Sequence, residues 1–500
     1  MQALLAPKKN SSPGLDDLPP VFLISCARTI AGPLTLVFQQ LLNAGTLPAE
    51  WSKATVIPIF KKGDRFDPKN YRAISLTSHF CKILEKILAE IITHFLIENN
   101  TIPPTQHGFL PRRSAVTNLL VATNNWTEEL DQGRPVDVIY LDYEKAFDKV
   151  PHCRLVYKLD HFGIRGTLLQ WIKSFVSNRN FRVRVGGQYS EEFDVNSGVP
   201  QGSVLGPLLF ITYISDLYIN IKTNILFFAD DTKIYCNPNI QRDMMMEDLA
   251  TLEEWTETWL LRLNREKCVV LHLGNGNPRF PYYIGNSAIR PVTQQKDLGV
   301  IMANDMKWET HIQHIVKKAN SLIFLVQKAF SSRSINVFEK LYKTYIRPKL
   351  EYCNVIWSPY YIKDIEMLER VQRKITKLPV TLKDLPYQER MIALNISSLK
   401  ERRERGDLIE TFKIITSYYD VDGLTNFLHR NTNLALRGHS KKLKKEKCAT
   451  LVRKNYLSNR VVYRWNALKE ETVGAVNKNV FKNRLDKDLH TLLNELIHYM

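Results

Sequence analysis

Three carboxylates stand where apolar strands of the predicted fold end. Asp142 closes the apolar segment 136–143, and Asp230 with Asp231 occupies the tip of an apolar hairpin at 225–235. A carboxylate in such surroundings is costly unless a cation offsets its partial burial. Magnesium prefers hard oxygen ligands, and two ions roughly 3.5–4 Å apart can activate an attacking hydroxyl and stabilise a leaving pyrophosphate. The acids therefore indicate metal-dependent phosphoryl transfer, although an isolated Asp-Asp pair is more often a solvated turn.

A glycine-rich segment lies between these acids. Residues 197–203 read Ser-Gly-Val-Pro-Gln-Gly-Ser. Glycines let the backbone approach a ligand closely, and Gln201 offers both a donor and an acceptor to a base pair or its sugar. Alone, the segment would be interpreted as a turn that opens a helix from about Leu205. The acids on either side favour a functional loop instead.

The elements that could hold these residues follow from the spacing of apolar side chains. Alternation and enrichment in Val, Ile and Tyr indicate strands, and a three-to-four-residue spacing indicates helices. Strand signals fade after residue 305, where helical patterns dominate. The patterns predict strands at 136–143, 181–185 and 193–195, a hairpin at 225–235, and helices at 80–95, 338–346 and 365–375.

The composition favours a polyanionic partner. Lys and Arg number 69 against 51 Asp and Glu, which gives a formal net charge of +18. This excess suits phosphate contacts and counterion release, although a basic balance by itself is weak evidence. Seven scattered cysteines show neither a disulfide pattern nor zinc-ligand spacing. The longest apolar run, Val204 to Ile214, is too short to span a bilayer, so a soluble intracellular protein without membrane contact is expected.

The acidic motifs and the glycine loop occur in a characteristic order. Leu-Asp-Tyr-Glu-Lys-Ala-Phe-Asp at 141–148 precedes the loop at 197–203, and Phe-Phe-Ala-Asp-Asp follows at 227–231. This order and spacing resembles motifs A, B and C of reverse transcriptases. Each string alone would be moderate evidence, but three strings in register are strong evidence.

Metal and sugar-binding roles are implied by this resemblance. Asp142 and Asp230 match the metal-binding carboxylates, the backbone carbonyl of Tyr143 is a further expected ligand, and Asp231 matches the second acid of the hairpin tip. The implied cofactor is a pair of Mg²⁺ ions, for which Mn²⁺ could substitute. Phe147 matches the aromatic residue beneath the incoming sugar, where a bulky ring would clash with a 2′-hydroxyl and so select deoxynucleotides. An ordinary core phenylalanine is the alternative there.

Fingers motifs of the same family are matched upstream of the acids. Lys61 and Arg72 are expected to bind the triphosphate, since an ammonium and a guanidinium fork both suit phosphate oxygens. Lys62 competes with Lys61 for this role, and solvated surface charge is the alternative for Arg72 and Lys61. The resemblance also implies that Gln201 and Gly202 contact the nascent base pair.

Other matches concern the template and the leaving group. In the fingers string at 106–114, Arg112 and Arg113 are expected to face template phosphates, and His107 is expected to be structural. Lys267 falls in a segment that resembles motif D, where a lysine could protonate the departing pyrophosphate as a general acid. A surface lysine is the alternative.

The last third of the chain is similar to jockey-like elements among the non-LTR retrotransposons, through strings at 341–352, 357–359 and 398–403. The resemblance implies a polymerase right hand of the α/β (α+β) class. An antiparallel sheet backed by helices would form fingers and palm, followed by a helical thumb and a helical C-terminal region. The expected divisions are an N-terminal extension at 1–50, fingers and palm at 51–300, thumb at 301–400 and a basic helical region at 401–500.

Basic residues are concentrated between Arg437 and Lys454. They suit a surface for RNA or for a primer–template duplex. They also resemble a nuclear import signal, and a nuclear location follows from the family resemblance.

The activity implied is that of an RNA-directed DNA polymerase. Its partners would be an RNA template, a DNA primer or RNA/DNA hybrid, and dNTPs. No endonuclease pattern precedes the polymerase motifs, so a fragment or a truncated reading frame is expected. Two alternatives stay open, namely an inactive or domesticated relic that binds nucleic acid without catalysis, and the reverse transcriptase of a bacterial retroelement or intron. The sequence does not indicate the oligomeric state.

Overall fold

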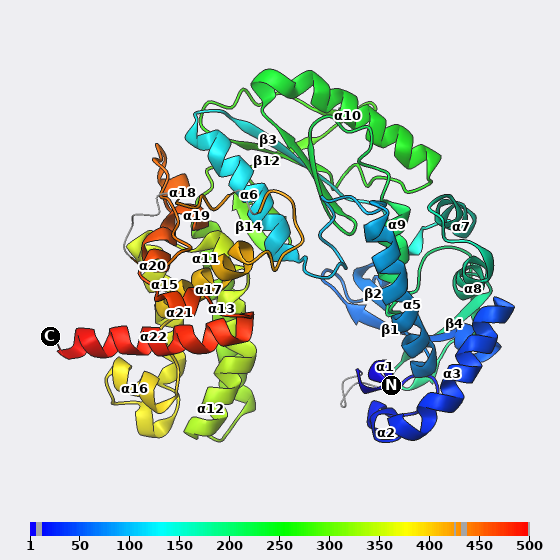
Figure 1. The fold of residues 1–500 in the computed structure, drawn as a ribbon, viewed down its shortest axis with the longest axis horizontal. Helices are drawn as coiled ribbons and strands as arrows, with labels where there is room; N and C mark the ends of the chain where they lie inside the picture. Colours follow the sequence, from blue (N-terminus) through cyan, green and yellow to red (C-terminus); the bar gives the residue numbers. More distant parts are fainter. Residues whose placement is uncertain (7–12, 425–426, 432–437, 499–500) are drawn as a thin grey trace.

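In the computed structural model, a sheet that we call the palm sheet joins two lobes into an arch (Figure 1). The N-terminal lobe stands at one end of the arch, and the helices that follow residue 305 form the lobe at the other end. The structure describes residues 1–6, 13–424, 427–431 and 438–498, with side chains of the last helix as far as residue 489. Within these ranges, no helix combines the length and the apolar character needed to cross a membrane.

The palm sheet has the strand order β12-β9-β3-β8-β7. At its centre, β3 (Val136–Leu141) runs antiparallel to β8 (Asp231–Cys236) and to β9 (Val269–Leu273). β7 (Asn224–Phe228) pairs antiparallel with β8, so the predicted hairpin is confirmed. The edge strand β12 (Arg290–Val292) runs parallel to β9. The expected antiparallel sheet is therefore present, with one parallel edge.

Both faces of the palm sheet are covered, which explains why β3 is buried along its length. Tyr140 packs in one buried cluster with α6 (Ala115–Asp131), whereas Ile139 belongs to a second cluster with α9 (Gly206–Tyr213) and α10 (Pro238–Thr258). Successive residues of a strand face opposite sides of a sheet. Helices α6 and α10 accordingly lie on opposite sides of it (Figure 1).

The N-terminal lobe contains a second sheet built on β1 (Lys53–Phe60). β2 (Tyr71–Leu76) pairs with β1 antiparallel, and β4 (Arg179–Val185) pairs with it in parallel. β5 (Gln188–Tyr189) and β6 (Phe193–Val195) both pair with β4, which confirms the hairpin predicted there. The other elements of this lobe are α1 (Gln2–Leu5), α2 (Pro20–Ser25), α3 (Ala27–Ala44), α4 (Ala49–Ser52), α5 (His79–Glu98), α7 (His152–His161), α8 (Gly166–Val176) and 3₁₀ turns at Pro68–Asn70 and Ala146–Asp148.

After the hairpin of β13 (Gln294–Asp297) and β14 (Val300–Ala303), the regular elements of the described chain are helices, as the fading strand signals predicted. The described residues between Ile415 and Leu451 are non-helical. A π-helical turn at Tyr342–Ile346 interrupts the helix predicted for 338–346. The remaining elements are β10 (Tyr283–Ile284), β11 (Ser287–Ala288), α11 (Glu309–Ala329), α12 (Ile335–Leu341), α13 (Arg347–Glu351), α14 (Asn354–Trp357), α15 (Ile362–Thr376), a 3₁₀ turn at Val380–Leu382, α16 (Tyr387–Ala393), α17 (Leu399–Ile415), α18 (Leu451–Lys454), α19 (Leu457–Arg460), α20 (Val462–Asn466), α21 (Glu470–Val473) and α22 (Lys478–His498).

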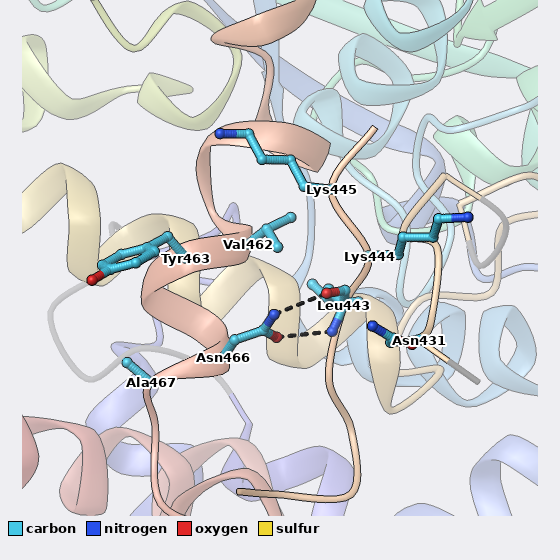
Figure 2. A pocket seen from close by; sticks show the side chains of 8 residues that line it. All are labelled: Asn431, Leu443, Lys444, Lys445, Val462, Tyr463, Asn466 and Ala467. Carbon is cyan, nitrogen blue, oxygen red and sulfur yellow. Dashed lines mark hydrogen bonds between the residues drawn. The ribbon is translucent and has the colours of Figure 1, made fainter. Parts of the chain in front are cut away.

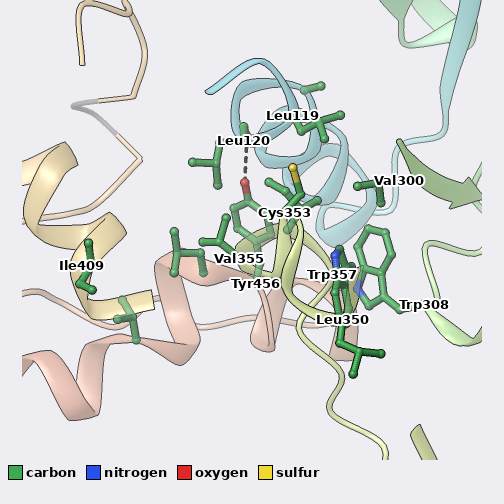
Figure 3. Packing of buried hydrophobic residues seen from close by; sticks show 14 of the residues in the cluster. Leu119, Leu120, Val300, Trp308, Leu350, Cys353, Val355, Trp357, Ile409 and Tyr456 are labelled. Carbon is green, nitrogen blue, oxygen red and sulfur yellow. Dashed lines mark hydrogen bonds between the residues drawn. The ribbon is translucent and has the colours of Figure 1, made fainter. Parts of the chain in front are cut away.

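Helix α6 connects the palm sheet with the helical lobe. Leu119 and Leu120 of α6 pack in one buried cluster with Cys353, Val355 and Tyr456 (Figure 3). The Tyr456 hydroxyl also donates a hydrogen bond of 2.8 Å to the carbonyl of Leu120. Residues more than 300 positions apart therefore share one core, and the helical lobe packs against the side of the palm sheet that α6 covers.

Candidate active site

The predicted acids meet at one end of the palm sheet. In the antiparallel pair of β3 and β8, Leu141 lies opposite Thr232. Asp142 follows Leu141 and Asp231 precedes Thr232, so the register brings these two acids to neighbouring strand ends. Asp230 stands at the tip of the turn that joins β7 to β8.

A cavity of about 410 Å³ opens at these strand ends. Four of the residues predicted for the site line it together, although they come from four separate segments of the sequence. They are Arg72, Asp142, Asp231 and Lys267. Residues of the β13–β14 hairpin also line the cavity, namely Gln295, Lys296, Asp297, Leu298 and Gly299.

The carboxyl groups at these strand ends repel one another. Burial raises the pKa of Asp230 above its ordinary value, and the charge of Asp142 raises it further, while Arg72 lowers it. The pKa of Asp231 is raised to about 6, first by loss of solvent around the carboxyl and then by the charges of Asp230 and Asp297. Both effects disfavour the charged form of an acid. Burial and the proximity of like charges therefore both favour the protonated form of these two acids at the strand ends.

The segment that follows α10, residues 263–267, lies beside Asp142. The Lys267 ammonium lies 3.3 Å from a carboxyl oxygen of Asp142, and both side chains are substantially exposed. The amide of Asn264 donates to the backbone carbonyl of Asp142 at 2.7 Å, and Tyr143 forms a β-bridge with Leu263. This places the motif D-like segment directly against the acid-bearing strand end.

The donor set at the strand ends fits a hard cation. Carboxylate oxygens are the ligands that Mg²⁺ prefers, and the mutual repulsion of Asp142, Asp230 and Asp231 is what a divalent charge would relieve. Within the described part of the chain, no group of three or more His, Cys, Asp or Glu side chains is placed to hold a metal ion, so the acids at the strand ends form an incomplete ligand set. An open set of this kind suits ions that take their other ligands from substrate phosphates and water.

The glycine loop lies against strand β2. The amide of Ser75 donates to the carbonyl of Gln201 at 2.7 Å, and Gly202 adopts a φ of 117° with its α-carbon so close to Ser75 that a Cβ would lie 2.5 Å from the Ser75 carbonyl oxygen. The side-chain amide of Gln201 donates to Asp148 at 2.8 Å. Glycine is therefore required at 202, and Gln201 has its NH₂ group engaged by the loop that carries Phe147.

Phe147 is held between two other rings. It stacks on Phe210 with ring centroids 4.3 Å apart and meets Phe109 edge-on at 6.0 Å. Phe147 is half-buried and stacks on the buried Phe210, so it lies at the edge of the core. The two interpretations of Phe147 from the sequence, core residue and sugar-facing residue, are thus compatible with each other.

The second sheet, which is built on β1 and which we call the fingers sheet, places Lys61 and Lys62 on different faces. Arg72 of β2 lies opposite Ile59 of β1, so the two side chains share one face of the sheet. The amide of Lys61 continues the pairing by donating to the carbonyl of Asn70 at 2.8 Å. By strand alternation Lys61 shares the face of Arg72, and Lys62 takes the opposite face.

Arg113 does not face a template, so that prediction is wrong. Its side chain is only 10% exposed. Its guanidinium donates to the backbone carbonyls of Pro103, Pro104 and Gln106 at 3.2, 2.9 and 2.7 Å. His107 is buried beside Thr117, and burial lowers its pKa to about 3, which agrees with the structural role expected for it. The motifs predict no role for Gln106, which belongs to the same string.

The basic cluster of the C-terminal region divides into two kinds of residue. Arg453 is buried, donates to Asn124 Oδ1 at 2.8 Å and lies 3.1 Å from a carboxyl oxygen of Glu446, and the expectation that it forms part of a binding surface is wrong. Lys444 and Lys445 instead line a cavity of about 460 Å³ (Figure 2). Tyr463 also lines this cavity and is 83% exposed, and Arg437 lies outside the described residues.

An antiparallel sheet with acids at its strand ends, a second sheet that carries Arg72, and the helical lobe that follows them together form the architecture of a hand-shaped polymerase. The family described as reverse transcriptase (RNA-dependent DNA polymerase) matches residues 59–320, just over half of the 500 residues. The chain belongs to this family.

The chain is also similar to individual proteins. It is 27% identical over 397 residues to the probable RNA-directed DNA polymerase from transposon X-element of Drosophila melanogaster, covering 75% of this chain and 43% of that one. It is 29% identical over 367 residues to the RNA-directed DNA polymerase from mobile element jockey of Drosophila funebris, covering 69% and 40%. The expected likeness to jockey-like elements is confirmed, and the chain spans less than half the length of these relatives. Among solved structures, apo telomerase from Candida tropicalis has a TM-score of 0.41 at 11% identity, covering 75% of this chain and 66% of that one.

Proposed function

We propose that this chain is the polymerase part of a non-LTR retrotransposon protein and extends a primer 3′-hydroxyl with dNTPs on an RNA template. The observation that carries the proposal is the convergence of Asp142 and Asp231, from adjacent strands, in one cavity that Arg72 and Lys267 also line. Family membership supports the class of reaction. The geometry supports the choice of residues.

Asp142, Asp230 and Asp231 would hold two Mg²⁺ ions, with the carbonyl of Tyr143 as a further ligand. The raised pKa values of Asp230 and Asp231 support this role, because a divalent cation would relieve the repulsion that contributes to them. When bound, the ions would lower the pKa of the attacking hydroxyl and stabilise the leaving pyrophosphate. Mn²⁺ accepts the same oxygen ligands.

The incoming nucleotide would lie between the fingers sheet and the palm. Arg72 and Lys61 share the face on which the triphosphate would bind, and a guanidinium fork beside an ammonium suits its oxygens. The sugar would rest on Phe147, where the ring would exclude a 2′-hydroxyl. Gln201 and Gly202 would contact the new base pair, and the bond from Gln201 to Asp148 leaves its side-chain carbonyl free to accept a hydrogen bond from that pair.

Lys267 would act after the nucleotide binds. Its pairing with Asp142 is an exposed one, and exposed ion pairs are weak. Metal binding to Asp142 would release the ammonium toward the triphosphate. It could then donate a proton to the departing pyrophosphate.

Template and primer would bind along the arch. The divisions proposed are an extension at 1–50, fingers and palm at 51–300, thumb at 301–400 and the basic helical region at 401–500. The net charge of +18 supports binding to an RNA template paired with a DNA primer. A nuclear site of action is part of the same proposal, and it rests on the family resemblance.

The test is primer extension by the full chain on a defined RNA template with dNTPs and Mg²⁺. Asp142→Asn should lower extension by more than about a hundredfold, because groups that merely orient metal ligands already contribute that much. Asp243→Asn is the matched control, since this carboxylate is 92% exposed on α10. Equal extension by the Asp142→Asn chain and the parent would overturn the assignment. A parent chain that binds RNA but never extends a primer would favour the inactive relic.

A further inference from the structure

The turn that carries Asp230 is held from outside by one buried side chain. Ala229, the residue before Asp230, adopts a φ of 55°, a left-handed conformation that is unfavourable for alanine. The amide of Ala229 donates to Oε1 of Gln106 at 2.9 Å, and the same oxygen accepts the amide of Gly108 at 2.8 Å. Gln106 is 1% exposed, so no solvent can replace this oxygen.

The segment around Gln106 lies alongside β7 and forms an isolated parallel β-bridge with Phe227. The amide of Phe227 donates to the carbonyl of Thr105 at 3.0 Å, and the amide of His107 donates to the carbonyl of Phe227 at 2.9 Å. Gly108 then approaches the turn so closely that a Cβ on it would lie 2.4 Å from the amide nitrogen of Ala229. The segment therefore cannot shift without moving the acid-bearing turn.

Arg113 anchors this segment to the helical lobe. Its Nη1 atom donates to the carbonyls of Pro103, Pro104 and Gln106. Its Nε atom donates at 2.8 Å to the carbonyl of Asp420, which follows helix α17. One guanidinium thus connects a loop of the C-terminal part of the chain to the segment that fixes the turn at Ala229.

We propose that Gln106 is a positioning residue for the active site: its side-chain carbonyl fixes the turn at Ala229 and thereby the direction in which Asp230 presents its carboxylate to a divalent cation. Arg113 holds Gln106 in register and makes this direction depend on the helical lobe. The inference rests on the proposed function for its consequence in catalysis, but its structural content is tested by metal binding.

The decisive measurement is the affinity of the full chain for Mn²⁺, followed by electron paramagnetic resonance. The chain carries an RNA template, a primer without a 3′-hydroxyl and a dNTP, so that no turnover occurs. Gln106→Leu removes the acceptor at nearly constant volume and should raise the Kd for Mn²⁺ by about tenfold or more. Gln106→Glu keeps an oxygen for both amides and should stay within about threefold of the parent.

Gln372→Leu is the matched control for lost stability. Gln372 is a fully buried glutamine of the helical lobe, and its amide donates to Tyr387 and to the carbonyl of Ser397. This variant should lower the Tm and leave the Kd for Mn²⁺ unchanged. A folded Gln106→Leu chain with the affinity of the parent, or an equal loss in Gln372→Leu, would overturn the proposal.

A second variant tests the turn without removing the hydrogen-bond acceptor. Gly108→Ala pushes a methyl group against the amide of Ala229 and should raise the Kd for Mn²⁺ by a similar factor, whereas Gly32→Ala, with nothing within 4 Å, should not. If Gln106→Leu fails to fold while Gly108→Ala binds like the parent, the proposal is overturned. If the parent binds Mn²⁺ but extends no primer, the proposed function fails and the Mn²⁺ comparison still decides the role of Gln106.

Discussion

Charged side chains are arranged differently in the helical lobe and at the strand ends of the palm. In the helical lobe, Arg460 binds Asp407 with two hydrogen bonds of 2.7 and 2.8 Å, and the two side chains are 15% and 10% exposed. At the strand ends, Asp230 and Asp231 lie close to each other and to Asp142, and their pKa values are raised. The helical lobe pairs opposite charges in this way, whereas the strand ends bring three carboxylates close together.

The two arrangements distinguish charged residues that stabilise the folded chain from charged residues that bind a ligand. A buried ion pair is part of the folded structure, and removing one partner leaves the other unpaired. A cluster of like charges opposes folding unless something else binds there, and such clusters are typical of functional sites. Substitutions in the two regions should therefore have opposite effects on stability and activity.

The largest effect is expected in the helical lobe. Arg460→Met leaves Asp407 buried without its cation and should lower the free energy of unfolding by about 3–5 kcal/mol. The double variant Arg460→Met with Asp407→Leu should recover most of this loss. Urea denaturation of the parent chain, the single variant and the double variant measures the three free energies of unfolding. A loss of less than about 1 kcal/mol in the single variant would mean that the pair is no more than a surface interaction.

The opposite behaviour is expected at the strand ends. Asp230→Asn should lower primer extension by about a hundredfold or more, which corresponds to about 2.7 kcal/mol. Its free energy of unfolding in the absence of metal should not fall, because the substitution removes one of the mutually repelling charges. Extension assays and urea denaturation on the same preparation give both numbers. A variant that is inactive because it is unfolded would contradict the comparison.

Most of the fold and the acids of the site could be predicted from local patterns. The strand ending at Asp142 and the hairpin tip at Asp230 are visible in the spacing of apolar residues, since both faces of the palm sheet are covered. The order of the three motifs then indicates the reverse transcriptase family. Alternation along β1 then favoured Lys61 over Lys62 once the pairing with β2 was known, and that pairing is not visible in the sequence alone.

The errors concern residues whose partners lie far away in the sequence. Arg113 looked like a template-binding residue, but its partners include the carbonyl of Asp420, 307 positions later. Arg453 belonged to a basic run, but Asn124 and Glu446 bury it. A cation in a basic segment carries no local sign of which acceptor it meets in the folded chain. Gln106 was overlooked for the same reason, since the residue it holds lies 123 positions away.

A smaller effect is expected from the titration of Asp231. Its pKa is about 6 in the folded chain against an ordinary 3.8, so the metal-free folded chain keeps a proton that the unfolded chain has released. The free energy of unfolding should therefore fall as the pH rises from about 4 to about 6, by about 1 kcal/mol after allowing for solvent screening. Asp231→Asn should remove this slope. Urea denaturation between pH 4 and 8 without divalent ions measures it, and an identical slope in both chains would contradict the prediction.

The smallest effects on stability are expected for the exposed lysines of the basic cluster, in contrast to its buried Arg453. Lys445 and Lys447 are exposed, and Lys445 lines the cavity beside Tyr463 (Figure 2). Lys445→Ala and Lys447→Ala should leave the free energy of unfolding within about 0.5 kcal/mol of the parent. If these ammonium groups contact phosphates, each substitution should also reduce the slope of log affinity for RNA against log salt by about 0.7–0.9.

Arg453→Met is the internal comparison. Because the Arg453 guanidinium is buried, its loss should lower the free energy of unfolding and leave the slope unchanged. Binding titrations at several salt concentrations would decide the matter, and an unchanged slope in both lysine variants would show that this part of the C-terminal region binds no nucleic acid backbone.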